Sequence, residues 1–146
     1  MPSAIRLAGL VIFGLMAWVV SEQIVATLPE GTYVGNFSKF NALIGAVLGW
    51  IFLNPRIAQR ASGPIGAGIT AAVAILIWGL MLHSIREMIK LALRKYYDGP
   101  VDAVVGVFQL MIDYGMQIAT PTIIITILVF GIVGGLVCSE VAKRWN

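Results

Sequence analysis

The side chains that could carry chemistry are few in this chain of 146 residues, which has one histidine, His83, and one cysteine, Cys138. Zinc and similar ions need three or four protein ligands, and His83 with Glu87 one helical turn later supplies two at most. A single cysteine cannot form a disulfide within the chain, and its apolar setting argues against a reactive thiolate. We therefore expect no metal site and no cofactor. The favoured interpretation is a histidine at headgroup level beside a solvated glutamate, with Cys138 as a small packing residue.

Four cations, Arg86, Lys90, Arg94 and Lys95, stand close together in the sequence. Such a group could gather a small inorganic oxyanion. It could also reach lipid phosphates, because long basic side chains extend to the headgroup layer while their stems stay in apolar surroundings. We favour contact with lipid headgroups and keep oxyanion binding as the alternative.

No catalytic grouping is recognisable in the sequence, which lacks a phosphate loop, a nucleophile elbow and a dinucleotide fingerprint. The net charge of +3 is spread along the flanks of apolar segments, so nucleic acid is not an expected partner. A transport pathway usually shows ionisable groups inside the spans. Glu22 and Asn41 could face each other across the first two spans, but solvation at the membrane interface is the favoured interpretation. The sequence thus predicts a protein that is not an enzyme.

The elements that must position these residues are apolar enough to need lipid around them. Hydrophobic residues make up 59% of the chain and charged residues 12%, about half the charge of a soluble domain. A helix needs roughly 20 apolar residues to cross a hydrocarbon core about 30 Å thick. The predicted transmembrane helices cover residues 6–28, 37–54, 65–82 and 121–142.

Local signals mark several ends of these spans. Asn54-Pro55 should end the second span, and Thr120 before Pro121 should begin the fourth as an N-cap followed by proline. Arg6 with the apolar run behind it also resembles a secretory signal, but no cleavage site of small residues follows. We expect an uncleaved first span.

Residues 83–97 and 101–118 predict two amphipathic helices at the membrane interface, separated by the breaker Asp98-Gly99-Pro100, whose aspartate can cap the second helix. The second helix carries a polar stripe. If it crossed the bilayer, its apolar residues would gain roughly 0.3–0.6 kcal/mol each and a central Asp113 would cost roughly 2.5–3.5 kcal/mol. The sum is close to zero, so an interfacial or re-entrant position is favoured. The predicted fold is an all-α membrane protein with four transmembrane helices and an interfacial helical hairpin between the third and fourth. All 146 residues form one membrane domain.

Orientation is not decided by the positive-inside rule, because the two sides carry five cations each. The sets are Arg6, Arg56, Arg60, Lys143 and Arg144 on the side of the N-terminus, and Lys39, Arg86, Lys90, Arg94 and Lys95 on the other. Acidic residues offset the second set, and on that ground we expect both chain ends in the cytoplasm.

Glycine spacing predicts where backbones approach each other. The spans contain two GxxxG pairs and one further small-residue face, and such surfaces let helices pack closely. They could dock a partner or a second copy, but packing within one bundle is the favoured interpretation. The glycines concerned are Gly45 and Gly49, Gly131 and Gly135, and Gly66, with Gly68, Ala71 and Ala72 beside it.

Several short segments, taken together, resemble the TrgA-type membrane proteins, a family named for tellurite resistance in photosynthetic and related alphaproteobacteria. The resemblance runs from end to end. It is carried by Leu28-Pro29-Glu30-Gly31-Thr32, Asn41-Ala42-Leu43-Ile44-Gly45 through Gly49-Trp50, Trp78-Gly79 with His83, Arg94 through Tyr97-Asp98-Gly99-Pro100, Tyr114-Gly115, Thr120-Pro121 and Trp145. The family often has an arginine after the tryptophan of the second span, where this chain has Ile51. The resemblance implies a multi-pass protein of the bacterial inner membrane linked to tellurite resistance, with no catalytic residues to transfer.

Three functions then compete. The favoured hypothesis is a non-enzymatic accessory membrane protein that docks on a larger complex or on itself, with lipids as further partners. The alternative is an oligomeric transporter or exporter of a small oxyanion such as tellurite. A membrane enzyme ranks last, because no acid, base and nucleophile are grouped.

Overall fold

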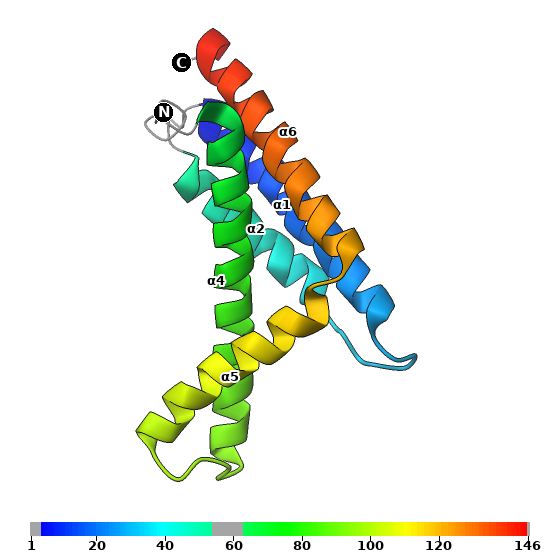
Figure 1. The fold of residues 1–146 in the computed structure, drawn as a ribbon, viewed down its shortest axis with the longest axis vertical. Helices are drawn as coiled ribbons and strands as arrows, with labels where there is room; N and C mark the ends of the chain where they lie inside the picture. Colours follow the sequence, from blue (N-terminus) through cyan, green and yellow to red (C-terminus); the bar gives the residue numbers. More distant parts are fainter. Residues whose placement is uncertain (1–3, 54–62, 146) are drawn as a thin grey trace. The chain divides into compact units, whose positions relative to one another are not determined.

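The structure, a computed structural model, describes residues 4–53 and 63–145, and over these residues it is all-α (Figure 1). This confirms the predicted helical class. In the hydrocarbon core of a bilayer no water can hydrogen-bond the backbone, and an α-helix pairs each backbone N–H and C=O within its own segment. The helices are α1 (Ala4–Thr27), α2 (Phe37–Phe52), α4 (Gly63–Leu93), α5 (Pro100–Ile118) and α6 (Pro121–Trp145).

Four of the described helices, α1, α4, α5 and α6, are long and apolar enough to cross a membrane, and this supports a multi-pass membrane protein. The set differs from the predicted one. α2 has 16 residues, about 24 Å at about 1.5 Å per residue, and is thus shorter than a hydrocarbon core of about 30 Å. α5 is long and apolar enough to be a membrane span, although an interfacial position was expected for residues 101–118. Asn54-Pro55, expected to end the second span, lies outside the described residues, as do Arg56 and Arg60.

The prediction of a separate interfacial helix over residues 83–97 was wrong. α4 continues without a break for 31 residues, through Leu82 and His83, and ends at Leu93. The change from apolar to basic residues after Leu82 alters which solvent the helix prefers, but no glycine or proline interrupts its backbone there. Residues 94–97 belong to the following turn.

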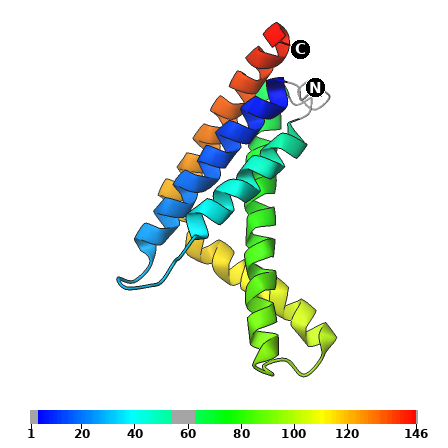
Figure 2. The same ribbon diagram turned by 180° about the vertical axis from the view of Figure 1, so that it is seen from behind.

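The chain divides into two compact units, Met1–Ile75 with Pro121–Asn146 and Leu76–Thr120, and each is described by itself. In the first unit α1 packs against both α2 and α6 (Figures 1 and 2). Gly9 near the start of α1 meets Gly49 near the end of α2, and Gln23 near the end of α1 bonds Thr126 near the start of α6. α1 therefore runs antiparallel to both neighbours.

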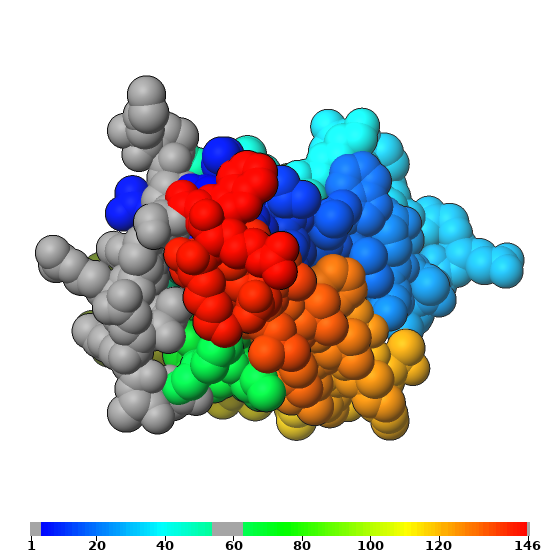
Figure 3. All heavy atoms as spheres, turned by 90° about the horizontal axis from the view of Figure 1, so that it is seen from above, coloured from blue at the N-terminus to red at the C-terminus, as the bar shows by residue number. Residues whose placement is uncertain are grey.

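The core of this first unit is formed by apolar side chains of α1, α4 and α6, together with Leu53. Figure 3 shows the last turns of α6, in red, beside α1, in blue. Most other apolar side chains of the unit remain exposed and suit a surface covered by lipid. The buried core residues are Ile5, Phe13, Met16 and Val20 of α1, Leu53 directly after α2, Ala67, Ala71, Ala72 and Ile75 of α4, and Ile123, Ile127 and Cys138 of α6.

The second unit is a hairpin made of the last part of α4, a turn, and α5. Lys95 has a φ of 57°, the left-handed conformation that ends many helices. The expected cap at Asp98 was wrong: Gly99 is the N-cap of α5, and the Asp98 backbone N–H donates to Asp102 Oδ2 at 3.3 Å. Gly99 can adopt its extended conformation directly ahead of Pro100, which fits the first turn of a helix.

The tip of the hairpin is held by the ring of Tyr97. This ring lies over Gly106, where an added Cβ would come within 2.6 Å of it, and it meets Tyr96 edge to face at a centroid distance of 5.2 Å. Farther along α5, Gly115 lies 4.0 Å from Leu80 Cδ1, measured from the position of an added Cβ. After the turn α5 comes back toward α4 and crosses it obliquely, with Gly115 near Leu80 (Figures 1 and 2).

Candidate functional site

The glycine pair of α2 forms a close seam with α1. A Cβ added at Gly45 would lie 2.5 Å from the Phe13 carbonyl oxygen and 2.5 Å from the Ala17 Cβ. One added at Gly49 would meet the Gly9 carbonyl group, and one added at Gly9 would lie 2.7 Å from the Gly49 carbonyl oxygen. The two backbones touch, so no larger residue fits at these positions unless the helices separate.

The glycine pair of α6 forms a second seam, with the first turns of α4. A Cβ added at Gly68 would meet the Gly131 carbonyl group and lie 2.7 Å from Gly135 Cα, and one added at Gly135 would meet the Pro64 carbonyl group. Gly66 is half-buried, and its carbonyl oxygen accepts a hydrogen bond from Thr70 Oγ1 at 2.8 Å. Within the small-residue face of α4, it is Gly68 that lies directly on α6.

Both seams thus join helices of one chain. Four of the five glycines singled out in the sequence, Gly45, Gly49, Gly131 and Gly135, have their close faces occupied by α1 or α4. A face in contact with backbone atoms cannot receive another protein at the same time. Any docking surface for a second chain must therefore be sought elsewhere on the described residues.

Two polar contacts reinforce the first unit. Asn41 Nδ2 of α2 donates to Ser21 Oγ of α1 at 2.9 Å, and Ser21 in turn donates to the Ala17 carbonyl oxygen at 2.6 Å. Gln23 Nε2 of α1 donates to Thr126 Oγ1 of α6 at 2.9 Å. The structure therefore places Ser21, and not Glu22, against Asn41. Hydrogen bonds of this kind join membrane helices where water is absent.

The reactive side chains are not grouped. Among the residues that the structure describes, no three histidine, cysteine, aspartate or glutamate side chains are placed to hold a metal ion. Cys138 is 1% exposed, and the Glu87 carboxylate bonds the Lys90 ammonium at 2.9 Å. Ser84 is buried, with no hydrogen-bond partner for its hydroxyl among the described atoms.

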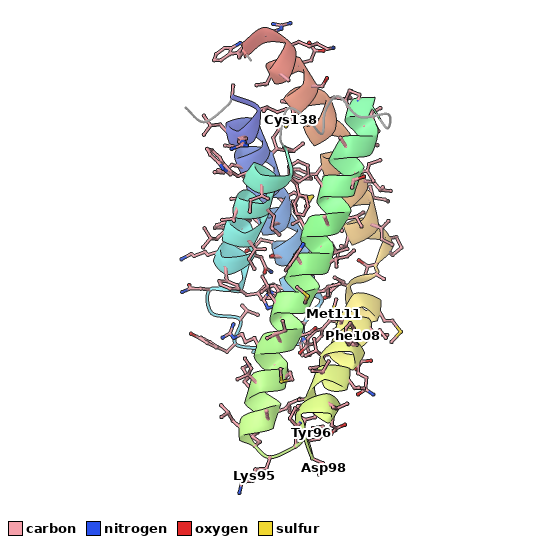
Figure 4. The ribbon with its side chains drawn as sticks, turned by 90° about the vertical axis from the view of Figure 1, so that its left-hand side faces the viewer. Lys95, Tyr96, Asp98, Phe108, Met111 and Cys138 are labelled. Atoms are coloured by element: carbon pink, nitrogen blue, oxygen red, sulfur yellow. The ribbon has the colours of Figure 1, made fainter. Side chains whose placement is uncertain are left out.

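The four predicted contact cations lie at the far end of α4 and in the turn after it. Arg86, Lys90, Arg94 and Lys95 reach the surface, and only Lys90 among them has an ion pair within the described residues. Figure 4 shows Lys95 and Tyr96 at the tip of the hairpin. The cations follow one another along the helix and its end, so they form an exposed basic surface there.

Of the described helices that could cross a membrane, α5 has the smallest buried share of its apolar window, 6%. Its outward face carries six exposed apolar side chains, and a polar stripe runs beside them. Phe108, labelled in Figure 4, is 62% exposed. The apolar side chains are Val101, Val104, Val105, Phe108, Ile112 and Met116, and the polar ones are Asp102, Gln109, Asp113 and Gln117.

Three contact residues, Gly9, Ser21 and Thr126, were not predicted from the sequence. A serine or threonine inside an apolar helix gives little signal, because its hydroxyl can also bond a carbonyl of the preceding turn, as Ser21 and Thr126 both do. Comparison with known protein families, with curated proteins and with solved structures found no match.

Proposed function

We propose that this chain is a non-enzymatic accessory subunit of the bacterial inner membrane, which acts by docking on other membrane proteins. The observation that carries the proposal is the outward face of α5. The glycine seams are filled within the chain, whereas the six apolar side chains of α5 and the cations of α4 have no protein cover among the described residues. The resemblance to TrgA-type proteins adds tellurite resistance as the phenotype, reached indirectly through the partner.

The length of α4 supports an interfacial position for the hairpin. Its 31 residues span about 46 Å at about 1.5 Å per residue, whereas the hydrocarbon core is about 30 Å thick. If α4 enters the core at Gly63, about 20 residues bring it to the other side near His83. Arg86, Lys90 and Arg94 then lie among headgroups, and the first half of α5 lies beside them at the membrane surface.

The test uses two variants with matched exposure. Ile112 on α5 is 61% exposed and Leu43 on α2 is 60% exposed. Each is changed to glutamine in the full-length chain, which is then extracted in mild detergent after brief cross-linking. Co-purifying proteins are quantified by mass spectrometry. We expect a stoichiometric protein partner that is retained by Leu43→Gln and lost by Ile112→Gln. Recovery of lipid alone with the unchanged chain would contradict the proposal, as would equal retention by both variants.

A further inference from the structure

Two cations and an open apolar surface follow one line along α4. Arg86 and Lys90 lie one helical turn apart, so their Cβ atoms are about 5–6 Å from each other on the same side of the helix. Gly79 lies within about 20° of the same line, at about 100° per residue. No described atom lies within 4 Å of a Cβ added at Gly79, and the neighbouring Trp78 and Leu82 are exposed. We call the open apolar surface of Gly79, Trp78 and Leu82 the Gly79 face.

The two cations of this line are available to an anion. Arg86 is exposed and forms no ion pair among the described residues. Lys90 pairs with Glu87 at 2.9 Å, and its ammonium group has further N–H donors. α5 approaches α4 at Leu80, which lies about 100° around the helix from Gly79. The line from the Gly79 face to Lys90 is therefore not covered by α5.

The depth of these residues suits a phospholipid. If α4 enters the hydrocarbon core at Gly63, Gly79 lies about 24 Å and Arg86 about 34 Å along the helix at about 1.5 Å per residue. The core is about 30 Å thick, so the Gly79 face lies among acyl chains and Arg86 and Lys90 lie among headgroups. Side chains of a helix tilt toward its N-terminus, and both cations therefore lean back toward the membrane surface. A molecule with a phosphate and an acyl chain can contact both parts of the line at once.

The charge of the line selects the kind of phospholipid. Arg86 and Lys90 with the single carboxylate of Glu87 leave one positive charge unbalanced. A zwitterionic lipid balances its phosphate with its own ammonium group, whereas an acidic phospholipid keeps a negative charge that basic side chains attract. One acidic phospholipid thus supplies the charge that this part of α4 lacks.

We infer that Arg86, Lys90 and the Gly79 face form a binding site for one acidic phospholipid, with the phosphate between the two cations and an acyl chain along the Gly79 face. This inference goes beyond the proposed function, because the site needs no protein partner. The cations at the end of α6 lack such a site. Lys143 has an ion pair, as Lys90 has, but Lys143 and Arg144 are consecutive and do not face each other. Gly134 and Gly135 of α6 are already in contact with α1 and α4.

The experiment counts the lipids that stay bound to the chain. The full-length protein is reconstituted in bilayers with equal amounts of phosphatidylglycerol and phosphatidylcholine and extracted in mild detergent, and the retained lipid is identified by native mass spectrometry. The unchanged chain should retain one phosphatidylglycerol and no phosphatidylcholine. Changing Arg86 and Lys90 together to glutamine should lower this retention by at least roughly tenfold, whereas changing Lys143 and Arg144 together to glutamine should have no effect. Equal losses in the two double variants, or equal retention of both lipids by the unchanged chain, would overturn the inference.

A third variant distinguishes a lipid from a free anion. Gly79→Leu keeps every charge and fills the Gly79 face, where an added Cβ meets no described atom, so it should lower phosphatidylglycerol retention several-fold. Excess inorganic phosphate should not displace the lipid from the unchanged chain. Displacement by phosphate, or full retention by Gly79→Leu, would show that the anion alone is recognised and would refute the lipid site. Ile112→Gln, which should release a protein partner, should keep the lipid, so the proposed function and this site can fail separately.

Discussion

Replacing Gly68 by alanine tests the most closely packed seam of the first unit. The added methyl group would meet the Gly131 carbonyl group and lie 2.7 Å from Gly135 Cα, whereas carbon atoms prefer a separation of about 3.5–4 Å. The obstructing atoms belong to the backbone of α6, so no side chain can rotate away. α6 must therefore move by roughly 1 Å.

The free energy of unfolding should reflect two opposing effects of this substitution. Overpacking costs about 1–3 kcal/mol, and exchanging glycine for alanine within a helix stabilises by about 0.5–1 kcal/mol. Gly79, on the same helix, has no described atom within 4 Å of an added Cβ, so Gly79→Ala retains the gain without the cost. The difference between the two variants, about 1–3 kcal/mol, isolates the overpacking term.

The assay is reversible unfolding in mixed detergent micelles, followed by tryptophan fluorescence as the fraction of denaturing detergent rises. Gly68→Ala should unfold at a lower fraction than the unchanged chain, and Gly79→Ala at an equal or higher one. A Gly68→Ala protein as stable as Gly79→Ala would refute the close contact of α4 and α6.

Three further outcomes are expected. In a double-mutant cycle, Asn41→Ala and Ser21→Ala should show a coupling energy of roughly 0.6–1.7 kcal/mol through their hydrogen bond, and additive effects in the same micelle assay would contradict that bond. Cys138, 1% exposed, should resist a maleimide in native micelles for a time that fully labels the unfolded chain, and rapid native labelling would show that its side of α6 is open. Vesicles containing the unchanged chain and vesicles containing the triple variant Arg86→Gln, Lys90→Gln and Arg94→Gln should show the same tellurite uptake, because we expect these cations to contact lipid headgroups. A flux that depends on them would support the oxyanion transporter instead.

The helical class and the main chain breaks could be predicted from local features. The breaker at Asp98-Gly99-Pro100 and the start of a helix at Pro121 both appear in the structure. Proline and glycine act on their own backbone and its nearest turns, so their effect does not depend on distant packing. The false boundary after Leu82 arose because the change to basic residues was taken as a helix end, although charge sets the preferred surroundings of a helix and not its continuity.

The sequence alone determined that lipid is the solvent, because its apolar content exceeds what so short a chain could bury, and it determined that backbone contacts through glycine were to be expected. Only the tertiary structure decided which backbones meet. Gly45 and Gly49 of α2 contact the backbone of α1, whereas Gly131 and Gly135 of α6 contact Gly68 and Pro64 of α4. A GxxxG pair can pack against any helix that approaches it closely. Which helix each pair contacts therefore depends on how the helices are arranged in space, with α1 antiparallel to both α2 and α6. Among the described helices that could cross a membrane, α5 has the smallest buried share of its apolar window, 6%.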